Sequence, residues 1–513
     1  MKKLRAILYS RSFNIISSLL INIALLIILC MFKLWLVYLG ICVACTTLFF
    51  VSLLLKNYNS KTNFILLLLA FMLPLLSYTL LKYSSSTRGR LRTRTKWKEL
   101  TNLETTYTEA QNKSVLNALA EKGTLANKTS KYINTTLCAP VFENNSVKYI
   151  TNGTQYLESI TKELKSAKKY IFIECSKLQD CNSWKNIFEI LKERAFAGVE
   201  IKLLYDDYYS LNAFKDNSTF KKLFNHKIET RAFNPISFAV GKTVSYRSMN
   251  NTIIIDGTVA FSGQIGLNDE YVDNIAVSES LPKTIGTAIQ IHGDAVTSIV
   301  KNYVTNWNLF GSSDALVLEK YLQKTPTKTR GKVYIQPFEI NPLIKESPRK
   351  NIQNNLINYA TKSIWITCPY LLIGNETKNS LIASARCGID VNIIVSKNYE
   401  ENWKNDLSFT NYGALIREGI KIYTIEDSKL SSQNIVIDEN TTLIGAGNVD
   451  SRKMYHSFEN GVLIYSEDIA KQAINNMKKL QSFGNQLTSK DLKKRNFFKK
   501  LNGAFLEIFS PLM

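Results

Sequence analysis

The sequence predicts an α/β protein of two similar units, preceded by apolar helices at the N-terminus. Helix-like and strand-like segments alternate from residue 141 onward, which predicts right-handed crossovers and a largely parallel or mixed sheet covered on both faces. The second half also repeats the first. The segment LKSAKKYIFIEC, which ends at Cys175, is echoed by INYATKSIWITC, which ends at Cys368. This internal duplication is visible in the residues themselves.

The individual elements of the first unit follow from the spacing of its apolar residues. Tyr156, Leu157, Ile160 and Leu164 recur at helical spacing, and a strand is expected next over 169–175. A helix over 184–196 and a strand over 199–207 complete the pattern. In the second half, ERAFAGVEIKLLY is echoed by SARCGIDVNIIVS, which predicts the same helix end and strand there.

A β-hairpin follows in each unit. Residues 246–271 and 430–453 each hold an apolar run, a turn at Asp256 or Asp438, and a second apolar run that ends in glycine. The two aspartates are 438 − 256 = 182 residues apart, which sets the length of the repeat. The expected boundaries are a first unit over 141–311, a connector over 312–331 and a second unit over 332–513.

The N-terminal 83 residues are expected to form a transmembrane region of two to three helices. Apolar runs cover Phe13–Phe32, Trp35–Leu55 and Phe64–Leu81. The first two are long enough to cross about 30 Å of hydrocarbon. Basic residues flank both ends of the region and leave its orientation open. We expect a multi-pass protein of the cell membrane with a cytoplasmic globular part, joined through a basic juxtamembrane linker over 84–140.

Composition limits the function classes. The formal net charge of +22 suits nucleic acid or an anionic membrane surface. The chain has 8 cysteines, and their spacing resembles neither a zinc site nor a disulfide framework. We therefore expect no metal and no cofactor.

The two hairpins resemble the double H-x-K-x4-D motif of the phospholipase D superfamily, and the surrounding residues are similar to those of bacterial cardiolipin synthases. The motif aspartates match Asp256 and Asp438, and the motif glycines match Gly263 and Gly445. This resemblance implies two tandem phospholipase D-like α/β/α sandwich units that pack as a pseudo-dimer. It also implies one active site, formed by both motifs where the units meet.

The histidines and lysines of this motif are replaced in both copies. The histidine positions hold Met249 and Ser431, and the lysine positions hold Asn251 and Gln433. In the family, one histidine attacks phosphorus and the other serves as acid and base, while the lysines stabilise the phosphoryl oxygens. Loss of a nucleophile or its base costs on the order of 10⁶-fold in rate. The resemblance thus predicts a membrane-anchored cardiolipin synthase-like protein without activity, which binds anionic phospholipid or regulates a partner.

The alternative is an active cardiolipin synthase that transfers a phosphatidyl group between two phosphatidylglycerols with unorthodox residues. Ser431 would be its nucleophile, or His456 its substitute base. The other two histidines, His226 and His292, are expected in a loop and on a strand without a catalytic role. A nuclease is disfavoured because it would need the same missing histidines.

Several retained polar residues are candidates for binding phosphate or lipid: Arg247, Ser262, Ser431, Asn448 and Arg452. The motif aspartates also have a structural interpretation, because aspartate suits a hairpin turn. The expected partners are an anionic phospholipid membrane and either an active cardiolipin synthase paralogue or another membrane protein. No nucleic acid is expected.

Overall fold

The computed structural model describes residues 11–54, 71, 73, 87–105, 112–121, 123–210, 227–235, 246–272, 281–311, 314–323, 331–344, 346–397, 402–426, 428–446, 457–494, 502–503 and 506. The candidate residues Asn448, Arg452 and His456, and also His226, lie outside this part of the chain. The chain divides into two compact units, and the second of them holds both halves of the internal repeat.

The first compact unit contains helices α2 (Arg11–Met31) and α3 (Trp35–Leu54), joined by a turn in which Lys33 has a φ of 55°. Within the described residues, no helix combines the length and apolar composition needed to cross a bilayer. The prediction of two to three transmembrane helices, and with it a multi-pass topology, is therefore not supported. Nearly all of the third predicted run lies outside the described residues.

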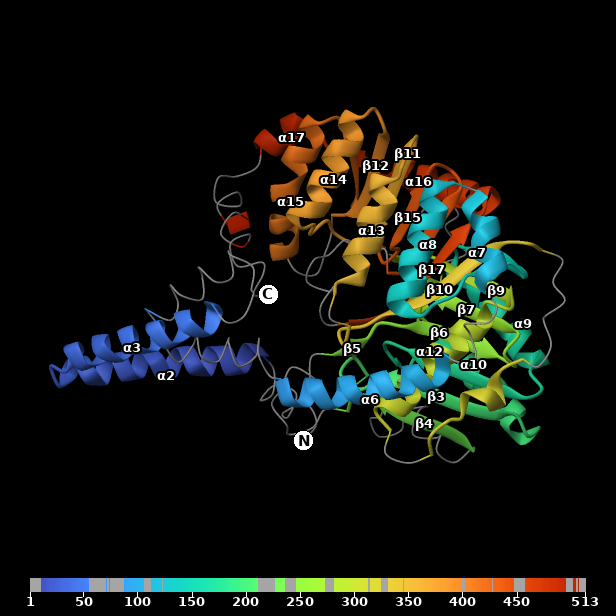
Figure 1. The fold of residues 1–513 in the computed structure, drawn as a ribbon, viewed down its shortest axis with the longest axis horizontal. Helices are drawn as coiled ribbons and strands as arrows, with labels where there is room; N and C mark the ends of the chain where they lie inside the picture. The colour runs from blue at the N-terminus through green and yellow to red at the C-terminus, as the bar shows by residue number, and fades with distance from the viewer. Residues whose placement is uncertain are drawn as a thin grey trace. The chain divides into compact units, whose positions relative to one another are not determined.

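Each half of the internal repeat forms one lobe of the second compact unit. The first lobe is built on a seven-stranded sheet with the order β1-β9-β7-β6-β2-β3-β4. The pairs β2·β3 and β3·β4 at one side are parallel, and all pairs from β2 to β1 are antiparallel, so the sheet is mixed, as the sequence predicts. Helices α9 (Gly153–Ser166) and α10 (Asn182–Phe196) cover its outer face (Figure 1). The strands are β1 (Asn145–Ile150), β2 (Tyr170–Cys175), β3 (Glu200–Asp206), β4 (Ile228–Phe233), β6 (Asn251–Ile255), β7 (Val259–Gly263) and β9 (Ala288–Gly293).

The second lobe repeats this plan with the strand order β10-β17-β16-β15-β11-β12-β13-β18. Its strands are β10 (Tyr334–Ile340), β11 (Ser363–Cys368), β12 (Asp390–Ser396), β13 (Lys421–Ile425), β15 (Asn434–Ile437), β16 (Thr441–Ile444), β17 (Ser457–Tyr465) and β18 (Asn485–Gln486). Its outer helices are α13 (Pro348–Asn358), α14 (Asn375–Arg386) and α15 (Asn402–Arg417), and α17 (Ser489–Lys494) packs on α15.

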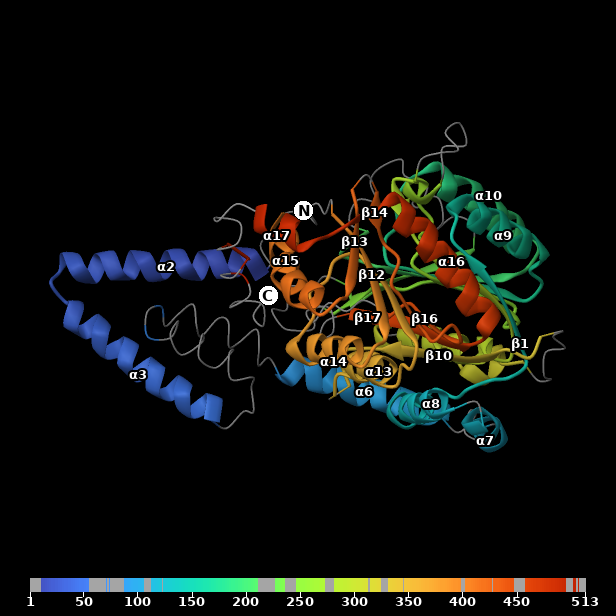
Figure 2. The same cartoon turned by 90° about the horizontal axis from the view of Figure 1, so that it is seen from above.

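Two equivalent helices form the interior between the lobes, α12 (Val296–Leu309) and α16 (Glu467–Phe483). Figure 2 shows α16 on one side of the second sheet and α13 and α14 on the other. Helix α12 also packs on β10 of the second lobe, and α16 on β1 of the first. One apolar core therefore extends across both lobes, with Trp307 and Met477 among its buried members. The two lobes are thus packed as a pseudo-dimer.

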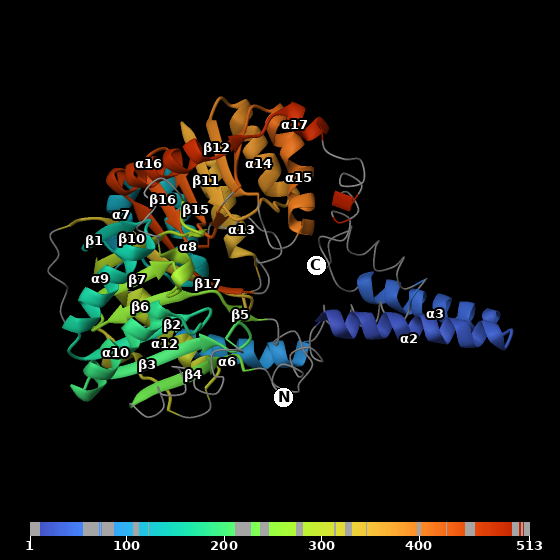
Figure 3. The same cartoon turned by 180° about the vertical axis from the view of Figure 1, so that it is seen from behind.

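Short strands cross from each lobe to the other. Strand β5 (Arg247–Ser248) pairs with β17, and β14 (Lys429–Leu430) pairs with β8 (Thr284–Ile285). Each crossing strand lies directly before the hairpin of its own lobe, so the beginnings of both hairpins meet at the junction. Figure 3 shows the two lobes and β5 from behind.

The segment expected as a basic linker is largely helical. It contains α6 (Thr87–Thr105), α7 (Asn112–Glu121) and α8 (Thr124–Leu137). Helices α7 and α8 bury Leu119 and Ile133 in the outer core of the second lobe. Helices α7 and α8 precede the first lobe in the sequence, but they belong to the core of the second lobe. Two single turns, η3 (Asp269–Tyr271) and η4 (Leu318–Tyr321), complete the described elements.

Candidate functional site

The two motif aspartates lie at the hairpin turns, away from the lobe junction. The Asp256 carboxylate accepts hydrogen bonds from the backbone amides of Lys168, Lys169 and Tyr170 at 2.8, 2.7 and 2.9 Å. Asp438 binds the amides of residues 361, 362 and 363 in the same way. The φ angles of the two aspartates are 52° and 51°. Each carboxylate therefore fixes the start of a central strand.

Replacing Asp256 with asparagine is expected to lower the free energy of unfolding by about 1–3 kcal/mol, because three amides lose a charged acceptor. Asparagine tolerates the left-handed backbone, so the change isolates the charge. Asp438→Asn is expected to behave alike. Denaturant titration measures the loss. An Asp256→Asn variant with unchanged stability would contradict the structural role of this aspartate.

The four positions where the motif histidines and lysines are replaced lie together at the lobe junction. They line one cavity of about 240 Å³. Met249 and Asn251 come from the first lobe, Ser431 and Gln433 from the second. The predicted candidate Ser262 also lines it and is 4% exposed. Further lining side chains, which the sequence did not indicate, are Lys177, Glu270, Tyr271, Thr284 and Lys429.

Ser431 is held by neutral groups. Its Oγ lies 3.1 Å from the hydroxyl of Tyr271 and donates to the carbonyl oxygen of Gln264 at 3.3 Å. Burial raises the pKa of Tyr271. The tyrosine hydroxyl therefore stays protonated near neutral pH and is a poor acceptor for the Ser431 proton.

The amide at the first lysine position is anchored, whereas the amide at the second is not. The Asn251 Oδ1 accepts from the backbone amide and hydroxyl of Ser176 at 3.3 and 3.1 Å. Gln433 is 9% exposed, and its Oε1 has no hydrogen-bond partner among the described residues. Thr284 is 3% exposed, and its hydroxyl likewise has no hydrogen-bond partner among the described residues. Two buried polar groups of the cavity wall thus lack a partner, which is costly unless a ligand or water fills the cavity.

The buried pair of Arg349 and Glu459 closes one side of the cavity. Arg349 Nη2 donates to Glu459 Oε2, and the two residues are 1% and 5% exposed. Glu459 lines the cavity, so its charge there is balanced by the arginine behind it. Residues of β17 thereby reach the beginning of the first hairpin, where Met249 donates its backbone amide to the carbonyl of Phe458 at 2.9 Å.

One predicted candidate, Arg247, does not belong to the cavity wall. Arg247 is 5% exposed and lies 3.6 Å from the carboxylate of Asp206, with a hydrogen bond to the carbonyl of Asn234. It is a buried structural residue. His292, the histidine that falls within the described residues, lies 2.9 Å from Gln290 and 3.8 Å from Glu163. It does not line the cavity.

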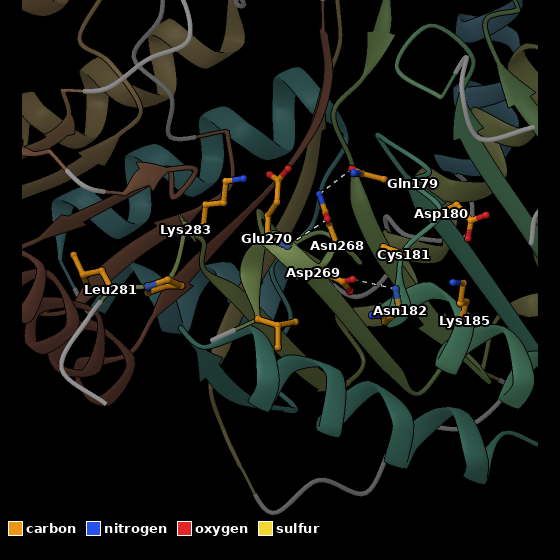
Figure 4. A pocket seen from close by; sticks show the side chains of 12 residues that line it. Gln179, Asp180, Cys181, Asn182, Lys185, Asn268, Asp269, Glu270, Leu281 and Lys283 are labelled. Atoms are coloured by element: carbon orange, nitrogen blue, oxygen red, sulfur yellow. Dashed lines mark hydrogen bonds between the residues drawn. The ribbon is translucent and has the colours of Figure 1, made fainter. Parts of the chain in front are cut away.

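A second pocket of about 590 Å³ adjoins the cavity and shares Asn268 and Glu270 with it. Figure 4 shows its wall, in which the Asn268 amide reaches Gln179 and the Asp269 carboxylate accepts from the Asn182 amide. Asp269 thereby caps the N-terminus of α10. The Asp269 carboxylate also accepts from the backbone amide and the hydroxyl of Ser183 at 2.8 and 2.5 Å, so it is satisfied within the fold.

Known proteins share both the sequence and the fold. The family profile described as cardiolipin synthase, PLD-like domain, matches residues 354–481. The chain is 28% identical over 377 residues to cardiolipin synthase 2 of Staphylococcus epidermidis, covering 72% of this chain and 75% of that one. Over most of its length the chain is thus similar to cardiolipin synthases, and its second lobe matches their PLD-like domain. An uncharacterised protein of Streptococcus mutans is 27% identical over 399 residues, covering 78% of this chain and 85% of that one.

The structure of phosphatidylserine synthase from Haemophilus influenzae aligns with a TM-score of 0.56. That alignment covers 75% of this chain and 98% of the other at 13% identity, which supports the fold alone. The phospholipase D-like α/β architecture expected for the cardiolipin synthase family is therefore confirmed. Within the described residues, no group of three histidine, cysteine, aspartate or glutamate side chains is arranged to hold a metal ion.

Proposed function

We propose that the protein binds the headgroup of an anionic phospholipid in the cavity between its lobes and does not transfer the phosphatidyl group. The observation that carries this proposal is the set of side chains at the four motif positions. Met249, Asn251, Ser431 and Gln433 line the cavity, and none is basic. Transfer through a covalent intermediate needs a nucleophile, a group that exchanges protons near neutral pH, and cations on the phosphoryl oxygens.

An active enzyme that uses Ser431 is less well supported. A serine nucleophile needs a base within hydrogen-bond reach. The contacts of Ser431 are a tyrosine hydroxyl with a raised pKa and a backbone carbonyl. Neither takes a proton at neutral pH, so the serine would attack as a neutral alcohol.

Binding is supported by the polar groups that the fold leaves unsatisfied. The Gln433 amide is buried at the cavity wall, and its oxygen has no partner among the described residues. A glutamine side chain both donates and accepts hydrogen bonds, so it suits the oxygen atoms of a phosphate or an alcohol. The lysines at 177 and 429 add positive charge to the same wall, and the whole chain carries +22.

Attachment to a membrane surface is a further part of the proposal. Large apolar side chains are exposed along α2 and α3, among them Leu20 at 60%, Leu36 at 63% and Leu48 at 73%. Such surfaces are unfavourable in water and mark contact with lipid or protein. A membrane location with the lobes in the cytoplasm, and regulation of an active cardiolipin synthase paralogue or another membrane protein, remain proposals that follow from this surface and the family.

Gln433→Met separates ligand binding from folding. Methionine keeps the volume and removes the unpartnered amide, so the free energy of unfolding is expected to stay constant or to rise by about 1 kcal/mol. Affinity for short-chain phosphatidylglycerol, measured by isothermal titration with the full chain, is expected to fall about tenfold, as for one lost hydrogen bond of about 1.4 kcal/mol.

Gln336→Met is the matched control. This buried glutamine already donates to the carbonyls of Ser130 and Ala139 at 3.0 and 2.8 Å, away from the cavity. Its loss is expected to lower stability and leave the affinity unchanged. The proposal is contradicted if the wild type binds no lipid, or if Gln433→Met binds as tightly as the wild type.

A further inference from the structure

Two carboxyl groups, one from each lobe, meet in the interior beneath the cavity. Glu174 lies on β2, a strand whose six residues are all buried, and it is 1% exposed. Glu339 lies on β10 of the second lobe and is 9% exposed. A carboxylate in such a position needs a cation, hydrogen-bond donors or a retained proton.

Two asparagines each connect both carboxyl groups. Asn306 Nδ2 lies 2.5 Å from Glu339 Oε2 and 3.4 Å from Glu174 Oε1. Asn250 Nδ2 lies 3.1 Å from Glu174 Oε1 and 3.5 Å from Glu339 Oε2. Ser248 adds a hydrogen bond of 2.8 Å to Glu174. The two acids therefore share the same neutral donors, one from α12 and one from the first motif.

No cation balances these acids within the described part of the chain, where neither carboxyl forms an ion pair. The nearby arginines face other acids: Arg247 lies against Asp206, and Arg349 against Glu459. Two buried oxygen atoms of the network, Glu174 Oε2 and Asn306 Oδ1, also lack a hydrogen-bond partner. A carboxylate oxygen and an amide oxygen are both acceptors, so the network is short of a donor hydrogen. One proton on a carboxyl group would supply it.

We propose that Glu174 and Glu339 form a proton-holding clamp between the lobes, in which at least one carboxyl stays protonated at neutral pH and its ionisation loosens the lobe junction. This inference goes beyond the proposed function, because it needs no ligand. The clamp also reaches the cavity, because Asn250 lies between Met249 and Asn251. Its Oδ1 accepts the backbone amide of Asn460 at 2.6 Å, which ties the first motif to β17.

The titration of both acids fits this arrangement. Burial raises the pKa of Glu174 to about 7, although hydrogen bonds from Ser248, Asn250 and Asn306 act in the opposite direction and lower it. Burial, with the neighbouring Glu174 charge, raises the pKa of Glu339 to about 8. The other titratable or charged groups that face the pair are Asp206 with Arg247, Cys175, Tyr303, and Glu459 with Arg349. Burial also raises the pKa of Asp206, to about 6.

The direction of the pH effect follows from these values. The folded protein keeps protons that the unfolded chain releases near the ordinary glutamate pKa of 4.5. The associated stability is fully present below that pH and is lost as the pH rises through about 7 and about 8. Over this window the unfolding equilibrium constant is expected to rise about tenfold per pH unit for each retained proton.

Denaturant unfolding of the full chain between about pH 5.5 and 8.5 tests the clamp. Glu174→Gln and Glu339→Gln each keep the size of the side chain and remove the titration, so each is expected to flatten the pH slope, and the double variant most. Glu193→Gln, on an exposed residue of α10, is the control and should keep the wild-type slope. A double variant with the wild-type slope would overturn the proposal.

Hydrogen exchange of the wild type gives a second readout that does not depend on any variant folding. The amides of Met249 and Asn460 bridge the lobes at the clamp. After correction for intrinsic exchange, their protection is expected to fall at least tenfold from pH 6 to pH 8.5, while that of the β3 amides changes less. Equal protection of the bridging amides at both pH values would overturn the clamp.

Discussion

Arg349→Met is expected to lower the free energy of unfolding by about 3–5 kcal/mol, because it leaves the Glu459 carboxylate buried without its partner. The guanidinium is 1% exposed, and Glu459 is the acid it binds. Guanidinium titration monitored by circular dichroism measures the loss.

The double variant Arg349→Met with Glu459→Gln distinguishes an unpaired charge from lost packing. Removing both charges leaves two neutral side chains, and such replacements are often close to neutral in stability. We therefore expect the double variant to regain most of the stability lost in the single variant. A single variant that unfolds at the wild-type denaturant concentration would show that the pair does not support the second lobe.

Restoring the four motif side chains is expected to create phosphatidyl transfer where the wild type has none. The variant carries Met249→His, Asn251→Lys, Ser431→His and Gln433→Lys, all at positions that line the cavity. The pair of imidazoles would supply the nucleophile and the proton carrier, whose loss typically costs on the order of 10⁶-fold. Product from labelled phosphatidylglycerol is measured by thin-layer chromatography.

A matched control keeps three of these changes and leaves Met249 in place. It has the same cavity lysines and one histidine fewer, so it should bind lipid without turnover. Hydrogen–deuterium exchange establishes that both variants are folded. A folded fourfold variant without product would contradict the view that the scaffold of the active family is retained around an altered site.

The lobes could be predicted from sequence because their central strands are buried on both faces. Such strands appear as continuous apolar runs between helical segments. The strand expected over 169–175 is β2 (Tyr170–Cys175), and that over 199–207 is β3 (Glu200–Asp206). The helix expected over 184–196 is α10 (Asn182–Phe196). Repetition of this pattern identified the second lobe.

Contacts between distant segments could not be read from these local patterns. The pairing of β8 with β14 brings Thr284 and Lys429 to the cavity, although neither belongs to a motif. Arg247 resembled a phosphate ligand because it lies beside the motif, but the fold pairs it with Asp206. Periodicity within one segment carries no information about which partner a crossing strand will meet.

The absence of phosphatidyl transfer is tested most directly by incubating the wild-type full chain with labelled phosphatidylglycerol. Intact-mass analysis of the acid-quenched protein and chromatography of the lipid are the two readouts. We expect neither a phosphatidyl adduct on the protein nor cardiolipin among the products. Turnover that disappears on Ser431→Ala or His456→Ala would contradict an inactive site, because the altered cavity would then contain a working nucleophile or base.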